Sequence, residues 1–326
     1  MKNLKILHLN NVAEVGKIIS NQQIISGLDS EFIDLVKPLS SSNFALKLLS
    51  LPIRFAHALL LRIKISLGSY DIIHVHYTTS ALFFLGIKSR LVVHVHGSDV
   101  RDQDKSKFRF LINKIVFKYS DLIFYSTPDL KIHLDKYEVT AIFAANPLDI
   151  ENFNETQLPL LSIFIHASIS QIKGATILIE AIKKIQYDYP GVKISYLGFG
   201  DTLDDIEKLK LNKMTKVKRE NLKSLISSHG LILGQFKVGA IGMSELEALA
   251  CNRPVVCHFE YDHVYKTPSP FLKAKTADEI YQHVKSYLEN PTSFLIDKEK
   301  YRAWVIENHS KEKIERLIYN NYLNLF

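Results

Sequence analysis

Short apolar runs alternate with longer amphipathic segments along most of the chain. Runs of roughly four to eight apolar residues rich in Ile and Val predict buried strands, whereas apolar residues that recur with a period of about 3.6 predict helices. Strands are expected at 5–9, 32–36, 71–77, 91–96, 122–126, 141–143, 162–167, 193–198, 230–234 and 254–256. Helices are expected from about residue 17 and at 44–66, 80–86, 105–120, 129–137, 174–188, 204–211, 243–251, 277–289 and 311–326. This alternation predicts an α/β fold with doubly wound parallel sheets.

The alternation pauses once, at residues 146–159. Two prolines, three asparagines and three acids within that stretch predict a linker. We therefore expect two similar α/β domains, at 1–150 and 151–310. The last helix, 311–326, is expected to close the fold and to pack back on the first domain.

The stretch 230–256 reads as a strand, a glycine loop, a helix and a second strand. In a parallel sheet such a loop lies at the carboxyl end of a strand, where ligands bind. The backbone N–H groups of Gly242, Met243 and Ser244 at the helix start would suit a phosphate. Glu247, one turn into the helix, could accept hydrogen bonds from the two adjacent hydroxyls of a ribose.

Composition agrees with a folded intracellular protein. The 326 residues are 47% apolar and 23% charged, which is typical of globular domains. The cysteines, Cys251 and Cys257, match neither a zinc nor a disulfide framework, so a reduced compartment is expected. The N-terminus leads directly into a strand without a leader pattern, and no apolar run is long enough to span a bilayer.

Basic residues are concentrated in the first half of the chain. The net charge of +7 includes 18 Lys and Arg against 13 Asp and Glu in residues 1–150. No acid lies between Asp34 and Asp71, and the apolar segment 44–66 falls there together with several basic residues. This segment could lie on an anionic membrane surface as a peripheral helix, or could form a buried helix pair broken at Pro52. A nucleic-acid partner is suggested only by the charge and is not expected.

Five short segments follow one another in order over nearly the whole chain. They are His-Gly-Ser-Asp-Val-Arg (96–101), Ser-Thr-Pro-Asp-Leu (126–130), Asn-Pro-Leu-Asp (146–149), Lys-Gly-Ala (173–175) and Ser-Glu-Leu-Glu-Ala-Leu-Ala-Cys-Asn-Arg-Pro-Val-Val (244–256). In this order they resemble the GT-B glycosyltransferases of retaining family 4. The resemblance implies two Rossmann-like domains with doubly wound parallel sheets, facing a cleft. It also implies a nucleotide-diphosphate sugar bound by the C-terminal domain and an acceptor bound by the N-terminal domain. Retention of configuration and catalysis without a metal or a further cofactor are implied as well.

The chain departs from the family pattern at two places. The family usually carries Glu-x7-Glu, and Glu247 matches the second Glu, but Gly239 stands at the first position. The family also usually has Gly-Arg ahead of its Lys-Gly, where this chain has Ala167-Ser168. The strand end His166-Ala-Ser168 resembles a variant form of the pattern. The mode of sugar recognition is therefore open.

The resemblance assigns roles to the donor side. Lys173 would neutralise the diphosphate, and Glu247 would hold the ribose, whereas the plain alternatives are a solvated lysine and an exposed helix carboxylate. The neighbouring Glu245 is expected on the exposed side of the helix. The expected donor-binding set is His166, Ser168, Lys173, Gly239, Gly242, Met243, Ser244 and Glu247.

The acceptor side is expected at the carboxyl ends of the first-domain strands. His96 follows a strand and is expected near the transferred sugar, which makes it a catalytic candidate together with Lys173 and Glu247. Asp99 and Arg101 would form an ion pair that orders the loop, or would contact the acceptor. The full acceptor-side set is Gly16, His96, Gly97, Asp99 and Arg101.

A metal site is not expected. His74 and His76 share one face of a strand, but the sequence shows no third ligand, and zinc sites normally have three or four.

The expected function is transfer of a sugar from a nucleotide diphosphate to an acceptor hydroxyl, on a lipid-linked or glycan precursor. A cytoplasmic enzyme, peripheral at the inner face of a membrane, fits this reading. The alternative is a non-catalytic relative that binds a nucleotide sugar and acts with a partner, as Gly239 suggests. A dinucleotide-dependent oxidoreductase is disfavoured because no Gly-x-Gly-x-x-Gly follows the first strand.

Overall fold

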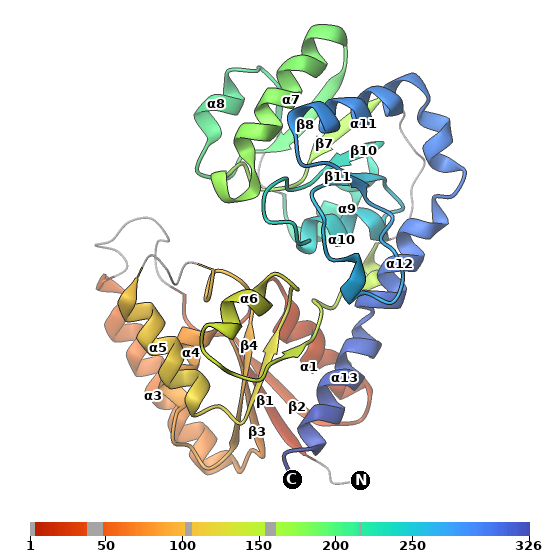
Figure 1. The fold of residues 1–326 in the computed structure, drawn as a ribbon. Helices are drawn as coiled ribbons and strands as arrows, with labels where there is room; N and C mark the ends of the chain where they lie inside the picture. Colours follow the sequence, from red (N-terminus) through yellow and green to blue (C-terminus); the bar gives the residue numbers. More distant parts are fainter. Residues whose placement is uncertain (1–3, 38–47, 102–105, 154–160, 215–216) are drawn as a thin grey trace. The chain divides into compact units, whose positions relative to one another are not determined.

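A computed structural model describes residues 4–37, 48–101, 106–153, 161–214 and 217–326. The chain divides into two compact units. The first contains the residues up to Pro147 together with Lys311–Phe326, and the second contains Leu148–Ser310. The C-terminal helix therefore belongs to the first unit, and the crossing between the units lies at 147–148 and 310–311 (Figure 1).

The first unit is built on a six-stranded parallel sheet in the order β2-β1-β3-β4-β5-β6. Its inner strands are buried on both faces, which is why they read as nearly continuous apolar runs. The strands are β1 (Lys5–Leu9), β2 (Asp29–Ile33), β3 (Ile72–His76), β4 (Arg90–Val95), β5 (Leu122–Tyr125) and β6 (Ile142–Phe143).

Helices cover both faces of this sheet. On one face, α1 (Val15–Ile25) and α13 (Lys311–Leu323) share an apolar core with the strands. On the other face lie α3 (Leu51–Gly68), α4 (Thr78–Ala81), the 3-10 turn η1 (Leu82–Phe84), α5 (Lys107–Lys118) and α6 (Leu130–Asp135), as Figure 1 shows.

The second unit repeats the plan with the parallel order β12-β11-β10-β7-β8-β9. Its strands are β7 (Ser162–Ile165), β8 (Lys193–Leu197), β9 (Asn212–Met214), β10 (Leu231–Leu233), β11 (Val255–Cys257) and β12 (Leu272–Lys273). Its helices are α7 (Ala175–Asp188), α8 (Leu203–Glu207), α9 (Arg219–Ser227), α10 (Met243–Ala250), α11 (Ala277–Glu289) and α12 (Glu299–His309). Short 3-10 turns are η3 (Ile150–Asn152), η4 (Gln171–Lys173), η5 (Asp262–Val264) and η6 (Pro291–Leu295).

One expected strand differs from the structure, and one expected helix break is found. The strand expected at 32–36 lies at Asp29–Ile33, because the polar residues at its start pair with β1 at the edge of the sheet, where burial is incomplete. The expected break near Pro52 is confirmed, because residues 48–49 are helical, Ser50 lies in a turn, and α3 begins at Leu51. Pro52 lies in the first turn of α3, where a residue needs no N–H acceptor. Residues 44–47 of the expected apolar segment lie outside the described residues.

Helix α3 buries only one side. Ala58, Leu61 and Ile65 face the core, while many of its other large apolar side chains are exposed. The buried helix pair considered from the sequence is therefore wrong for the described part of this segment. Within the described ranges, no helix combines the length and the hydropathy that crossing a bilayer requires.

Candidate functional site

In the second unit, most of the expected donor residues gather at the carboxyl ends of β7 and β10. These strands are parallel neighbours, with Ile165 opposite Leu233. The loop after β7 contains His166 and leads to Lys173, and the loop after β10 leads to the start of α10. Because the carboxyl ends of parallel strands share one edge, the sequence-distant segments 166–174 and 234–247 meet there.

Lys173 is held in place by the loop after β10. Its Nζ donates a hydrogen bond to Oε1 of the buried Gln235, 2.9 Å away. Its carbonyl accepts the N–H of Phe236 at 2.8 Å. The next residue, Gly174, has φ +85°, and a β-carbon there would lie 3.1 Å from the backbone of Phe236. A glycine is thus required for the two loops to pack this closely, and the half-buried ammonium of Lys173 is positioned as a result.

Glu245 ties the end of β10 to the start of α10. Its carboxylate accepts the N–H of Gln235 at 3.0 Å and the N–H of Gly242 at 2.8 Å, which closes the first turn of the helix. The expectation of an exposed Glu245 is wrong, because the side chain is 2% exposed and serves as a cap.

The Gly242 amide is therefore engaged by Glu245 and does not face outward. The N–H groups of Met243 and Ser244 have no acceptor within α10, since they belong to its first turn. Both residues are half-buried, and their N–H groups remain the candidates for binding a phosphate. A β-carbon built at Gly242 would lie 3.9 Å from Nζ of Lys173, so the cation stands beside the same turn.

Glu247 forms a hydrogen bond with His166. Its Oε2 lies 3.0 Å from Nε2 of the imidazole, and both side chains are nearly fully buried. The carboxylate therefore fixes the His166 ring with Nε2–H pointing at it. The plain alternative of an exposed helix carboxylate is therefore wrong for Glu247, which is 2% exposed. Ser168, two residues after His166, is half-buried at the same strand end.

A second carboxylate, missed from the sequence, lies beside Gly239. Gly239 has φ +75°, and a β-carbon there would lie 3.3 Å from Oε2 of Glu260. The backbone N–H of Glu260 also donates to the carbonyl of Gly239 at 3.0 Å. Lys275 and, to a lesser degree, His258 hold the pKa of the Glu260 carboxyl below its usual range. The position expected to hold a Glu is thus next to an ionised Glu that comes from beyond β11.

In the first unit, five histidines line up across three strand ends. Among them, His8, His74, His76 and His94 are fully buried, and His96 is half-buried. Neighbouring rings stack with centroids 4.5–5.5 Å apart. The strand register produces the cluster, because His8 pairs with His74 and His76 pairs with His94.

Three of these rings form a hydrogen-bonded chain. Nε2 of His8 lies 2.9 Å from Oε1 of Gln23, so that nitrogen carries the proton. Nδ1 of His8 then accepts from Nε2 of His76 at 3.2 Å, and Nδ1 of His76 accepts from Nε2 of His96 at 3.0 Å. The chain is satisfied by neutral rings, each one a donor and an acceptor.

Burial keeps these rings neutral. Desolvation lowers the pKa of His8 to about 4, against a smaller opposing effect of Gln23, and it lowers the pKa of His96 to about 3. Desolvation, and then the neighbouring histidines, depress the pKa of His74 and His76 far below the usual range. His96, the expected catalytic candidate, is therefore a neutral imidazole near pH 7 with Nδ1 as its acceptor.

The reason given for excluding a metal here is wrong, because His8 supplies the third nitrogen that the sequence did not reveal. His8, His74 and His76 offer nitrogens close together, as do His76, His94 and His96. In the described arrangement, however, the rings of His74 and His76 are only 12° from parallel, and those of His94 and His96 are 22° from parallel. A metal must lie in the plane of every ring that binds it, so rings stacked in this way cannot converge on one ion.

The remaining acceptor-side residues order the loop after β4. Asp99 is fully buried and accepts the N–H of Gly97 at 2.7 Å and the N–H and hydroxyl of Thr78 at 3.3 Å. Arg101 binds Asp129 through Nε at 2.6 Å. The expected Asp99–Arg101 pair is therefore wrong, because each side chain has a different partner.

Two glycines of the acceptor-side set serve close packing. A β-carbon at Gly16 would lie 2.9 Å from the His76 ring, and one at Gly97 would lie 2.3 Å from the Arg101 guanidinium. Both residues are buried, so they shape the strand ends and present no surface of their own.

Residues 10–127, which lie in the first unit, match a family model described as glycosyl transferase 4-like. No curated protein matches the chain.

Several solved structures share the fold over nearly their whole length. Sucrose-phosphate synthase from Thermosynechococcus elongatus superposes with a TM-score of 0.76 at 14% identity, covering 99% of both chains. Anabaena HepE in complex with UDP and glucose superposes with a TM-score of 0.71 at 12% identity, covering 98% of this chain and 99% of the other. An α-glucosyltransferase in complex with UDP and DNA superposes with a TM-score of 0.72 at 13% identity, covering 98% of this chain and 100% of the other. The expected two-domain GT-B fold is confirmed, and the family match supports the expected enzyme class, a glycosyltransferase.

Proposed function

We propose that this protein transfers a glycosyl group from a nucleotide-diphosphate sugar to an acceptor hydroxyl. The observation that carries the proposal is the placement of Lys173. Its ammonium is held by Gln235 beside the first turn of α10, where two helix N–H groups have no intrahelical acceptor. A cation and a helix N-terminus at one strand edge together make a site for a diphosphate.

The proposed chemistry is electrostatic. The bond from the anomeric carbon to the diphosphate breaks, and its electron pair leaves with the diphosphate oxygen. Lys173 and the amides of Met243 and Ser244 stabilise this developing charge. The acceptor oxygen bonds to the anomeric carbon on the same face, and its proton passes to the departing diphosphate oxygen. Attack on that face gives retention, which the resemblance to family 4 also implies.

The sugar and ribose contacts are proposed as follows. Glu247, oriented by His166, holds the ribose hydroxyls after a small opening of its buried pocket. Glu260 and His258 bind hydroxyls of the transferred sugar in place of the carboxylate that Gly239 lacks. This assignment rests on the 3.3 Å approach of the Glu260 carboxylate to a β-carbon at Gly239.

We propose UDP as the nucleotide, since HepE and the α-glucosyltransferase, which share the fold, are described in complexes with UDP. The acceptor, a glycan or lipid-linked precursor, is assigned to the first unit, where His96 ends the histidine chain. A neutral His96 with Nδ1 as acceptor can bind a hydroxyl of the acceptor or of the sugar.

A donor screen tests the proposal. Nucleotide release from UDP-, GDP-, dTDP- and CMP-sugars would be followed without acceptor, with and without EDTA. We expect slow hydrolysis of UDP-sugars, unchanged by EDTA and lost in Lys173→Ala. The matched control is Lys183→Ala, which removes an exposed lysine from α7 of the same unit. Equal hydrolysis by the two variants would contradict the assignment of Lys173.

Gly239 also favours a second candidate, a protein that binds a nucleotide sugar without turning it over and acts with a partner. UDP-sugar binding with no nucleotide release, alone or with any acceptor tried, would select this alternative. It would leave the position of the donor site unchanged.

A further inference from the structure

The outward face of α3 and α5 exposes large apolar side chains that no described element covers. Phe55, Leu59 and Ile63 repeat every four residues along α3, so they form one stripe. Phe108, Leu111 and Ile115 form a corresponding stripe on α5, and Phe108 is 73% exposed. Contiguous exposed apolar surface of this kind marks an interaction site.

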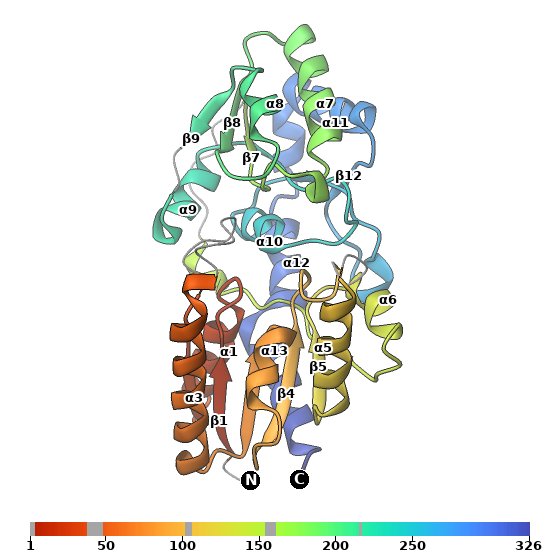
Figure 2. The same ribbon diagram turned by 90° about the vertical axis from the view of Figure 1, so that its left-hand side faces the viewer.

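The turn η1 joins the two stripes into one surface. It contacts both α3 and α5, and Figure 2 shows these two helices on the same side of the first unit. The rings of Phe55 and Phe83 meet edge to face with centroids 6.4 Å apart. Arg62 of α3 donates to the carbonyl oxygens of Phe83 and Leu85 at 2.9 Å, which fixes α3 to the turn.

This surface is also basic. Helices α3 and α5 together hold seven Lys and Arg and no Asp or Glu, and one of these cations, Lys64, pairs with Glu31 of β2. On α5, Lys107, Lys114 and Lys118 are exposed beside the apolar stripe, and no carboxylate pairs with them among the described residues. By contrast, helix α13 on the opposite face of the sheet contains both acidic and basic residues, with Glu312 in its first turn.

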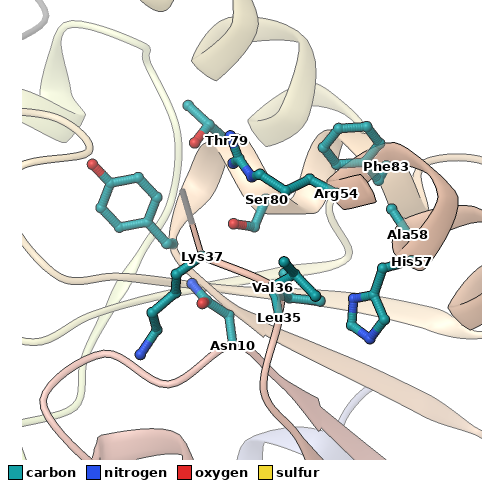
Figure 3. Close-up of a pocket in the computed structure, with 11 residues that line it drawn as sticks. Asn10, Leu35, Val36, Lys37, Arg54, His57, Ala58, Thr79, Ser80 and Phe83 are labelled. Carbon is teal, nitrogen blue, oxygen red and sulfur yellow. The ribbon is translucent and has the colours of Figure 1, made fainter. Parts of the chain in front are cut away.

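A pocket of about 280 Å³ lies at the start of α3 and is lined by Arg54 and by Lys37, which also pairs with Asp34 at 3.3 Å. Figure 3 shows Arg54, His57 and Lys37 at its wall, with Asn10 and Ser80 among the polar groups. The Arg54 side chain has no ion-pair partner in the described residues. Arg54 also lines a neighbouring shallow apolar pocket formed with Leu51, Pro52, Phe55 and Phe83. A polar cationic pocket therefore opens directly onto the apolar surface.

We propose that this face docks on an anionic lipid bilayer, with the phosphate of one lipid in the pocket at Arg54 and His57. The apolar stripes enter the boundary between head groups and chains, and the lysines of α5 remain at head-group level. The chemistry favours a bilayer over two other occupants. Four of the six stripe side chains, Leu59, Ile63, Leu111 and Ile115, are aliphatic and give nucleic-acid bases no face to stack on. A second copy would bring an equally basic face against this one. The proposal is independent of glycosyl transfer.

Flotation with vesicles tests the proposal on the full-length protein. We expect binding to phosphatidylcholine vesicles that contain phosphatidylglycerol, and much weaker binding to phosphatidylcholine alone. Lys107→Gln/Lys114→Gln/Lys118→Gln should weaken binding roughly a hundredfold, since each cation near an anionic surface contributes close to fivefold. Leu59→Ser/Leu60→Ser removes two exposed leucines of α3, Leu60 being 64% exposed, and should weaken binding to both kinds of vesicle. Arg54→Gln/His57→Gln should weaken binding to vesicles that contain phosphatidic acid, whose phosphate is the most accessible.

Matched controls lie in the second unit. Lys183→Gln/Lys193→Gln/Lys210→Gln removes three exposed lysines there, and Tyr187→Ser/Ile296→Ser removes two exposed large side chains. Both controls should float like the parent, and circular dichroism should show every variant folded.

Three results would overturn the proposal. One is that the parent does not float with anionic vesicles. Another is that the variants and their matched controls lose vesicle binding equally. The third is that light scattering shows a dimer, or that the protein binds duplex DNA tightly, and that Leu59→Ser/Leu60→Ser abolishes this dimer or DNA binding while flotation with vesicles is unchanged.

Discussion

At the residue scale, Gly239 and Glu260 show how a missing side chain can be replaced from elsewhere in the chain. The carboxylate of Glu260 lies where a side chain at 239 would begin, and Lys275 keeps it ionised. A carboxylate held there is suited to accepting hydrogen bonds from sugar hydroxyls.

We predict that Glu260→Gln weakens the use of a UDP-sugar but not the binding of UDP. Loss of charge-assisted hydrogen bonds to the sugar should cost about 1.5–3 kcal/mol, a tenfold or larger fall in kcat/KM. Calorimetry with UDP should give the parental affinity, because UDP lacks the sugar. Glu180→Gln, which removes another lysine-paired carboxylate in the same unit, is the control. A parental kcat/KM in Glu260→Gln would refute the role of Glu260.

Glu245 gives a prediction about stability. Glu245→Ala removes the acceptor for two backbone N–H groups at the start of α10. The free energy of unfolding should fall by about 2–3 kcal/mol, because these donors are left without a partner. Glu245→Gln keeps one acceptor oxygen and should lose less. Urea denaturation measures both changes, and an unchanged midpoint in Glu245→Ala would show that the cap does not contribute.

At the element scale, strand register explains what sequence reasoning could and could not find. The alternation of buried strands and helices predicted two parallel sheets, since each inner strand is apolar on both faces. The register of β1 against β3 brings His8 beside His74. The local sequence of β1 does not reveal this register, so the pairing of the two histidines could not be predicted. The same limit hid Glu260, which reaches Gly239 across the sheet edge from the loop after β11.

Short and polar elements escaped prediction for a related reason. Strand β9 has three residues, two of them exposed, so no apolar run marks it. Helix α12 distributes its buried residues, Tyr301, Trp304 and Val305, without a strong apolar stripe. Motif order located Lys173 and Glu247, but it gave no information on which carboxylates of α10 are buried.

The histidine cluster predicts acid sensitivity of the first unit. The folded-state pKa values of His8 and His96, about 4 and about 3, lie below the unfolded value near 6.5. The unfolded chain therefore binds more protons between pH 6.5 and 4, and stability that is complete above pH 6.5 is lost as the pH falls. Each such histidine should contribute up to about 1.4 kcal/mol per pH unit.

Urea unfolding at pH 7.5 and pH 5 measures this loss. His94→Leu, which removes one buried ring whose pKa is also strongly depressed by burial, should reduce the dependence on pH. Equal stability of the parent at the two pH values would contradict the account of the cluster.

At the scale of the whole molecule, each unit carries its own chemistry on its own sheet. The second unit places a cation, a helix start and carboxylates at one strand edge. The first unit places a neutral histidine chain at its strand ends and a basic, apolar face on α3 and α5. This division fits the proposed transfer of a sugar from a donor on the second unit to an acceptor on the first.

The most direct test is calorimetric titration of the protein with UDP, in the parent and in Lys173→Ala and Lys183→Ala. We expect the parent to bind UDP and Lys183→Ala to bind it equally well. Lys173→Ala should bind UDP roughly tenfold more weakly or worse, because a charge-assisted contact to the diphosphate is lost. A parent that does not bind UDP would contradict the choice of nucleotide. Equal affinity in the parent and Lys173→Ala would contradict the donor site itself.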